Sequence, residues 1–198
     1  LIYTYQGGAN ALPLNGGTPT GYYLKKLLIA ATDTRPATAN TMKHSWVIFR
    51  MGEAYLNYAE AVFQYFKSQG RADAADATSA EFPVSARDLA SKTRLRSKMK
   101  AIPAGMSNDD FWAKYQNERR VELAFEGHRF WDVRRWKEGS KYFSKITEMH
   151  ITKNADGTYT YTPKTVNRLW EEKFNFFPIP QSDIMKNPNL DQSITGWK

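Results

Sequence analysis

The stretch from Glu118 to Trp136 reads ERRVELAFEGHRFWDVRRW, and it decides the fold class. Apolar and aromatic residues recur through it at helical spacing, and Gly127 interrupts the pattern. We therefore predict one helix over residues 108–126 and a short aromatic and basic helix over residues 128–136. Helices that mix so many rings and charges indicate a mainly helical protein in which some charged groups are partly buried.

Three glutamates of this stretch, Glu118, Glu122 and Glu126, are four residues apart and share one helix face. Paired carboxylates are the catalytic groups of glycosidases, so Glu118 and Glu122 raise the hypothesis of a glycoside hydrolase. Arg119 and Arg129 lie close by in the sequence. A neighbouring arginine lowers the pKa of a carboxyl group, whereas a general acid needs that pKa raised. We therefore interpret the glutamates as members of a structural ion-pair network.

Two further helices are predicted upstream, over residues 46–67 and residues 85–100. Apolar residues at spacings of three and four line one face of the first of them, namely Ile48, Met51, Tyr55, Ala59, Val62 and Phe66. Gly70 ends this helix. Two consecutive helices joined in this way form an antiparallel pair, the unit of tetratricopeptide-like helical repeats.

The rest of the chain is less regular. Residues 1–45 are expected to be irregular, and within them residues 21–31 are compatible with a short strand or with one helical turn. Residues 149–161 predict a β-hairpin with a four-residue turn at residues 154–157. A proline-rich tail with one helical turn at residues 181–184 ends the chain. The turn signals of the first segment are Gly7, Gly8, Pro13, Asn15, Gly16, Gly17, Pro19 and Pro36. We accordingly divide the chain into an irregular segment (1–45), a helical core (46–136) and a loop, hairpin and tail (137–198).

The composition limits the classes of function that the chain can have. The 198 residues carry a net charge of +8, which would attract acidic polymers, and a basic helical nucleic-acid binder or protein-interaction scaffold is the alternative function. The densest basic run is Lys92, Arg94, Arg96, Lys98 and Lys100. Its spacing of two distributes charge around a helix, so we interpret it as a solvated surface and expect no nucleic acid partner.

Sequence signals for catalysis and cofactors are weak. Without cysteine the chain has neither disulfides nor thiolate metal ligands, and its three histidines show no zinc-ligand spacing. His128 and Asp132 are spaced to orient an imidazole, but a nucleophile in a recognisable setting is missing, so we interpret His128 as a core or interface residue. We expect no catalytic residue, no metal and no cofactor.

The aromatic residues are the remaining candidates for a site. Trp46, Trp112, Trp131 and Trp136 lie in or beside predicted helices and are expected in the core. Tyr159, Tyr161 and Trp170 lie in the least regular region and are expected to be more exposed. These three are weak candidates for ligand contacts, because flat amphipathic rings suit binding surfaces.

Three blocks of sequence together resemble the SusD/RagB family. The first is HSWVIFRMGEAYLNYAEA at residues 44–61, and the second is the stretch from Glu118 to Trp136 quoted above. The third is FPIPQSDI at residues 177–184, followed by Asn187-Pro188-Asn189-Leu190 and by Gly196. Their order and spacing also fit the family, so the resemblance covers the chain from Tyr22 onward.

This resemblance implies a fold, a location and a function. Members are lipid-anchored proteins on the extracellular face of the Bacteroidota outer membrane, with tetratricopeptide-like helix pairs and long loops. They capture oligosaccharides, or in some members oligopeptides, for import through SusC-like TonB-dependent transporters, and they are not enzymes. Full members are longer and begin at a lipidated cysteine, so the resemblance implies that residues 1–198 form the C-terminal region of such a receptor, without its N-terminal lipid anchor.

The polar residues of the first two blocks are interpreted as a scaffold clamp. Polar groups among so many rings would be partly buried, and buried charges persist when they are paired. The expected structural ion-pair network consists of Arg50, Glu53, Glu118, Arg119, Glu122 and Arg129. We expect Arg119→Ala to cost about 3–5 kcal/mol, the penalty for breaking a buried charge pair.

Overall fold

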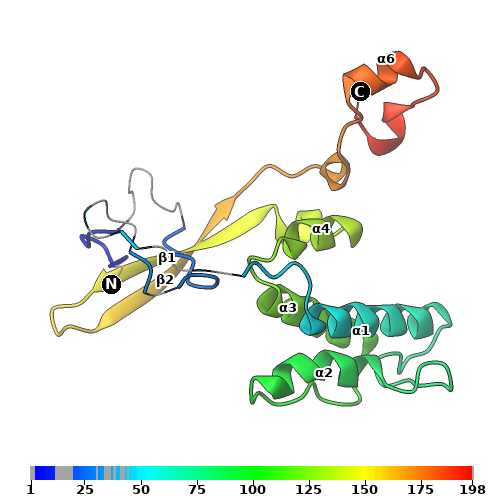
Figure 1. Ribbon diagram of the computed structural model, residues 1–198, viewed down its shortest axis with the longest axis horizontal. Coiled ribbons are helices and arrows are strands. Elements are labelled where there is room, and N and C mark those ends of the chain that lie inside the picture. Colours follow the sequence, from blue (N-terminus) through cyan, green and yellow to red (C-terminus); the bar gives the residue numbers. More distant parts are fainter. Residues whose placement is uncertain are drawn as a thin grey trace. The chain divides into compact units, whose positions relative to one another are not determined.

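The computed structural model describes residues 3–11, 20–29, 31–33, 37, 39, 40, 43 and 45–197. Several expected turn signals (Pro13, Asn15, Gly16, Gly17, Pro19 and Pro36) and His44 lie outside the described residues. The described part is mainly helical, with one two-stranded antiparallel sheet (Figure 1), which confirms the predicted fold class. The chain divides into a helical unit, Asn40–Arg129, and a hairpin unit made of Leu1–Ala39 and Phe130–Lys198.

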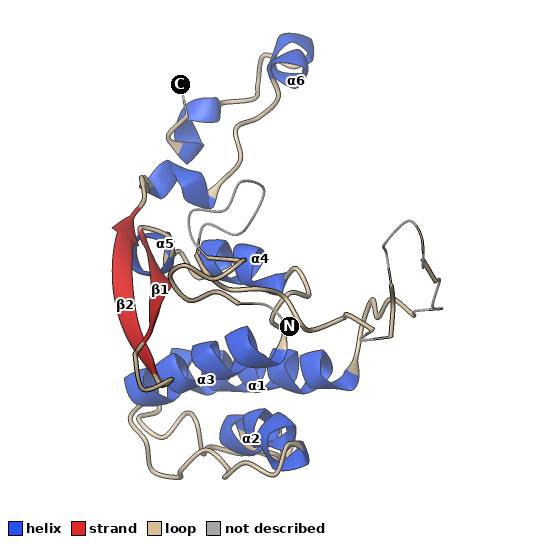
Figure 2. Cartoon of the chain, turned by 90° about the vertical axis from the view of Figure 1, so that its left-hand side faces the viewer, coloured by secondary structure: helices blue, strands red, loops and turns tan. Residues whose placement is uncertain are grey.

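The helical unit is built from α1 (Met51–Ser68), α2 (Ala86–Arg96) and α3 (Asn108–Glu122). These three helices lie side by side in both views (Figures 1 and 2). The start of α1 contacts the end of α3, because Arg50 binds Glu122, and the end of α2 contacts the same end of α3, because Arg94 binds Glu118. Helix α1 is therefore antiparallel to both α2 and α3, and the predicted antiparallel pair is confirmed.

The core of this unit follows from the apolar faces of the three helices. Phe63 of α1 lies 4.9 Å from Phe111 and stacks on Trp112 at 5.7 Å, both measured between ring centroids. Fully buried side chains from α1, α2 and α3 complete it, among them Leu56, Ala59, Val62, Ala86, Leu89, Ala90 and Tyr115. Burial of such side chains contributes about 1.5–3 kcal/mol for each large residue, which makes this face the main stabilising feature of the unit.

Side-chain caps fix two of the helix starts. Ser85 accepts a hydrogen bond from the Asp88 amide, and Ser107 accepts one from the Asp110 amide. Each hydroxyl replaces a hydrogen bond that the first turn of a helix cannot form within itself. The starts of α2 and α3 are therefore fixed by local side-chain signals.

Three helix bounds differ from prediction. Helix α1 starts at Met51, five residues later than expected, because Arg50 is extended and residues 45–50 are not helical. Helix α2 ends at Arg96 instead of residue 100, since Lys98 adopts a left-handed conformation with φ 57°. Helix α3 ends at Glu122 instead of residue 126, and Phe125 is again left-handed with φ 62°.

The hairpin unit contains β1 (Lys145–Lys153) and β2 (Tyr159–Asn167), paired antiparallel with Ile151 opposite Tyr161. The predicted hairpin is confirmed but is longer at its open end. Its turn depends on Gly157, which has φ 85°, and on the Asp156 carboxylate, which accepts hydrogen bonds from Thr158. The residues 21–29 that were compatible with a strand or a helical turn form neither, and contain a turn at residues 26–27.

Shorter elements complete this unit. They are α4 (His128–Arg135), whose first two residues belong to the helical unit, α5 (Gly139–Tyr142), the 3-10 helix Glu172–Asn175, α6 (Gln181–Lys186) and the 3-10 helix Gln192–Thr195. The predicted helical turn at residues 181–184 is the start of α6. Phe130 and Trp131 of α4 lie 6.0 and 5.7 Å from Phe177, so ring contacts attach the third sequence block to α4.

Two tryptophans expected in the core are exposed. Trp46 is 68% exposed and Trp131 is 58% exposed, whereas Trp112 and Trp136 are half-buried. Trp46 precedes α1 in the extended segment, so it has no helix face to bury. The prediction for Trp131 was wrong because the contacts of its ring with Phe130 and Phe177 leave more than half of the side chain exposed.

Candidate functional site

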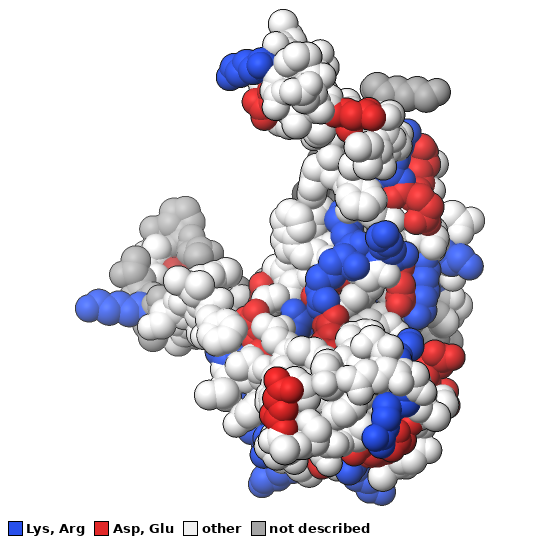
Figure 3. Space-filling view, turned by 90° about the vertical axis from the view of Figure 1, so that its right-hand side faces the viewer, with Lys and Arg blue, Asp and Glu red and all other residues white. Residues whose placement is uncertain are grey.

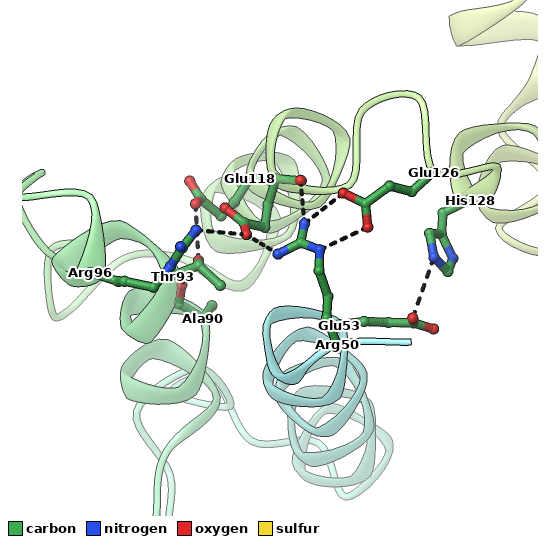
Figure 4. Close-up of polar contacts among 9 residues, drawn as sticks. Arg50, Glu53, Ala90, Thr93, Arg96, Glu118, Glu126 and His128 are labelled. Atoms are coloured by element: carbon green, nitrogen blue, oxygen red, sulfur yellow. Dashed lines mark hydrogen bonds and ion pairs between the residues drawn. The ribbon is translucent and has the colours of Figure 1, made fainter. Parts of the chain in front are cut away.

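Arg50 joins α1 to the end of α3. Its Nε and Nη2 atoms donate hydrogen bonds to the two carboxylate oxygens of Glu126 at 2.8 and 2.9 Å (Figure 4). Its Nη1 atom binds the Glu122 carboxylate, and Nη2 also donates to the Glu122 carbonyl oxygen. The hydrogen bonds to Glu126 chiefly raise the pKa of Arg50 above its usual range.

These contacts also explain why α3 ends where it does. The last carbonyl groups of a helix have no partner within the helix, and here the guanidinium of Arg50 supplies one for Glu122. Gly52 leaves room for it, because a Cβ atom at that position would lie 2.7 Å from the Arg50 Nη1 atom. Sequence reasoning missed Gly52; its one signal is a glycine in the first turn of a helix, where alanine would be favoured.

Glu118 belongs to a neighbouring cluster between α2 and α3. Its Oε2 atom accepts a hydrogen bond from Arg94 at 2.7 Å, and its Oε1 atom accepts one from Thr93 at 3.1 Å. Arg96 reaches Glu122 at 3.2 Å. Two members of the predicted basic run are thus bound to carboxylates of α3, which argues against a phosphate-binding stripe on α2.

The other polar residues of the two blocks are distributed over separate contacts. Arg119 is 5% exposed and donates a hydrogen bond to the Asn57 side chain at 2.7 Å. Glu53 lies 3.4 Å from the His128 Nε2 atom, and the half-buried Arg129 follows in α4. Sequence reasoning placed Glu53, Arg119 and Arg129 in one network, but it did not identify Asn57 as the partner of Arg119 or Arg94 as the partner of Glu118.

The hairpin carries the two tyrosines that were predicted as weak candidates for ligand contacts. Tyr159 and Tyr161 are two residues apart on β2 and therefore project from the same face of the sheet. They are 43% and 62% exposed, and the ring of Tyr5 lies 5.7 Å from that of Tyr159. Together Tyr5, Tyr159 and Tyr161 form a row of phenol rings, which we call the tyrosine face.

A groove of about 490 Å³, which includes the outer edge of β1, is lined by residues of β1, β2 and the N-terminal segment. The main chain of the N-terminal segment follows this edge, since the Gln6 amide donates a hydrogen bond to the Ile151 carbonyl oxygen at 2.7 Å. His150 and Lys164 both contact Glu148, and the hydrogen bond with His150 lowers the pKa of that carboxyl group. The groove is lined by Thr4, Gln6, Met149, His150, Ile151, Thr152, Thr162, Pro163 and Lys164.

Trp170 lies apart from the tyrosine face, in a second cavity of about 260 Å³. It is half-buried and packs directly on Gly139, where a Cβ atom would come within 1.8 Å of the indole ring. We call this space the arginine cavity, because two arginine residues line it; its walls include Phe130, Arg134, Phe143, Arg168, Trp170 and Phe174. Sequence reasoning missed both arginines of this cavity.

The described residues contain no group of three or more His, Asp or Glu side chains placed to hold a metal ion. Both carboxylates of the glycosidase hypothesis, Glu118 and Glu122, accept hydrogen bonds from arginines. The described residues instead form features suited to binding, namely exposed rings, a groove along the hairpin and a cavity lined by two arginines.

Comparison with known proteins decides the family. The sequence model of the SusD family matches residues 1–197. The chain belongs to the SusD family. No curated protein sequence matches it.

A solved structure supports the assignment. This SusD-family chain is similar to a SusD-like protein from Bacteroides fragilis, with 28% sequence identity and a TM-score of 0.57. The match covers 79% of the present chain and 27% of that protein. The chain therefore spans about a quarter of the length of the relative it matches. Among the described residues, no helix is both long and apolar enough to cross a membrane.

Proposed function

We propose that this SusD-family chain is the C-terminal region of a cell-surface receptor that captures oligosaccharides for import. The observation that carries the proposal is the family match over residues 1–197. We further propose that the whole receptor is anchored by lipid on the extracellular face of the outer membrane, that it delivers its ligand to a SusC-like TonB-dependent transporter, and that it is a binding protein without catalytic activity.

The tyrosine face is the proposed contact for neutral sugars. Aromatic rings offer flat apolar surfaces to the C–H faces of sugars, and the phenol hydroxyl groups add hydrogen bonds. Tyr159 and Tyr161 project side by side about 6–7 Å apart, as residues two apart on a strand do. That spacing suits two successive rings of an oligosaccharide better than a single sugar.

The test is calorimetric titration with a panel of neutral oligosaccharides. We expect the double variant Tyr159→Ala/Tyr161→Ala to lose about 10-fold or more in affinity, since truncating an aromatic contact residue commonly costs more than 1 kcal/mol. Tyr22→Ala is the matched control, because Tyr22 is also exposed, at 53%, and lies in the same unit. Equal losses in both variants would remove the tyrosine face from the binding site.

Salt dependence separates this function from the alternative. Binding of a neutral oligosaccharide should change little with ionic strength, whereas a protein that contacts 6–10 phosphates loses about 10³–10⁵ in affinity between 50 and 200 mM salt. On the face shown in Figure 3, basic side chains lie beside acidic ones. Arg94 and Glu118 form one such ion pair between α2 and α3. Salt-sensitive binding of nucleic acid together with no affinity for any glycan would contradict the receptor function.

A further inference from the structure

The arginine cavity differs from the charged clusters of the helical unit in what surrounds its guanidinium groups. The Arg134 guanidinium lies 3.5 Å from the ring centroid of Phe130, 5.3 Å from that of Phe143 and 5.6 Å from that of Trp170. These contacts are attractive, and they fix the direction of the guanidinium plane. The rings, together with a hydrogen bond from the Arg134 Nη1 atom to the Phe130 carbonyl oxygen at 3.2 Å, therefore hold the side chain in place.

Among the described residues that line the cavity, none carries a carboxylate. The Nε atom of Arg134 and the indole Nε1 atom of Trp170 are both buried without a hydrogen-bond acceptor in the described part of the chain. Burial without a counter-charge lowers the pKa of Arg134. A buried donor without an acceptor is unfavourable, and so is a desolvated cation without an anion. The cavity thus has two arginine residues and no carboxylate among its described lining residues, an arrangement that suits a ligand group with negative charge.

We propose that the arginine cavity binds one acidic sugar unit of the captured glycan, whose carboxylate or sulfate group pairs with Arg134 and Arg168. This inference rests on the proposed glycan-receptor function and adds the substrate class. The volume of about 260 Å³ is slightly below the range of about 300–1,000 Å³ typical of drug-sized ligands, so one ring fits better than a whole oligosaccharide.

The walls favour a sugar over a simple anion. Trp170 and Phe174 meet edge to face at 5.7 Å, so the walls combine apolar ring surfaces with two arginine residues. A sugar ring matches this combination, because it has an apolar face and hydroxyl acceptors at its edge. The net charge of +8 also raises the local concentration of acidic polymers around the protein.

The test compares charged glycans with neutral counterparts of the same structure. Oligosaccharides of galacturonic acid and of glucuronic acid are titrated beside their carboxyl-reduced forms, and sulfated galactose oligosaccharides beside their desulfated forms. We expect at least one charged member to bind about 10-fold or more tightly than its counterpart, the gain expected from one charge-assisted hydrogen bond. The neutral counterpart keeps the stacking faces and loses only the charge.

Arg168→Gln should abolish this preference. Arg168 is exposed, so its replacement is not expected to affect folding, and urea unfolding checks that it does not. Arg120→Gln is the matched control, because it removes the same charge from an exposed arginine of the helical unit that does not line the cavity. We expect Arg120→Gln to keep the preference for charged over neutral glycans and Arg168→Gln to lose it.

Three outcomes would overturn the inference. Equal affinity for charged and neutral members would refute the acidic class and leave the glycan receptor standing. Absence of binding to every glycan would refute the receptor function as well. Arg168-dependent binding of a peptide carboxylate, without binding of any acidic glycan, would assign the cavity to peptides.

Discussion

Replacing Arg50 with methionine would remove the guanidinium that attaches the start of α1 to the end of α3. Arg50 forms four hydrogen bonds with Glu122 and Glu126, and these two carboxylates are only 12% and 14% exposed. Methionine preserves most of the apolar volume, so the main loss is electrostatic. We expect this variant to destabilise the helical unit.

The magnitude follows from the environment of the pair. Removing one partner of a buried ion pair costs about 3–5 kcal/mol. Arg50 is itself 25% exposed and Glu122 keeps a second contact with Arg96, so the low end applies, at about 3 kcal/mol. With a urea m-value of about 2 kcal/mol/M, this cost lowers the unfolding midpoint by about 1.5 M.

The assay is urea unfolding followed by far-ultraviolet circular dichroism, which reports mainly on α1, α2 and α3. Arg120→Met is the matched control, because Arg120 is exposed and makes a hydrogen bond with Asn117; its expected cost is below about 0.5 kcal/mol. A midpoint for Arg50→Met as high as that of the control would refute the reasoning. Adding Glu126→Gln to Arg50→Met should cost less than the sum of the two single changes, since both break the same contact.

The remaining predictions concern buried contacts and one titrating group. Tyr115→Phe should cost about 1–3 kcal/mol in the same urea assay, because its buried hydroxyl binds both a carboxylate and a carbonyl oxygen of α1. Gly139→Ala should displace Trp170, change the near-ultraviolet circular dichroism and destabilise the hairpin unit by about 1–3 kcal/mol, since the added methyl group would overlap the indole. The hydrogen bond from His150 lowers the pKa of Glu148, so this carboxylate stabilises the folded hairpin above about pH 4–5 and the contribution is lost as pH falls through the lowered pKa. An NMR titration should give a Glu148 midpoint below its ordinary value in the natural chain and a higher midpoint in His150→Ala.

Local signals in the sequence were sufficient to predict which helices and strands form, but not where each of them begins and ends. The caps at Ser85 and Ser107 and the turn glycine at Gly157 act within a few residues, so the helices and hairpin could be predicted. The end of α3 could not be predicted, because Phe125 adopts a left-handed conformation, and phenylalanine is not a residue that indicates such a conformation in a sequence. The start of α1 was missed because the apolar residues before Met51 continue the helical period although they are not helical.

The partners of the polar residues were harder to predict than the residues themselves. The charged side chains of the first two blocks were recognised, but Glu118 binds an arginine 24 residues away and Arg119 binds an amide 62 residues away. Such pairs depend on how the helices are arranged, which no spacing within one helix encodes. The arginine cavity was missed for the same reason, since α4 and the segment around Trp170 meet only in the folded hairpin unit.

Arg50 and Arg134 lie in opposite surroundings, and we expect the first to act in folding and the second in ligand binding. Arg50 is bound by two carboxylates and a carbonyl oxygen, so its charge is satisfied within the fold, and its removal should lower stability. Arg134 lies among rings, with no carboxylate among the described residues around it, so its charge is available to a ligand. The two kinds of variant should therefore dissociate: Arg50→Met should lower the urea midpoint and leave glycan selectivity unchanged, whereas Arg168→Gln, at the edge of the arginine cavity, should remove selectivity for charged glycans and leave the midpoint unchanged. Loss of both properties in either variant would mean that folding and binding depend on the same charges.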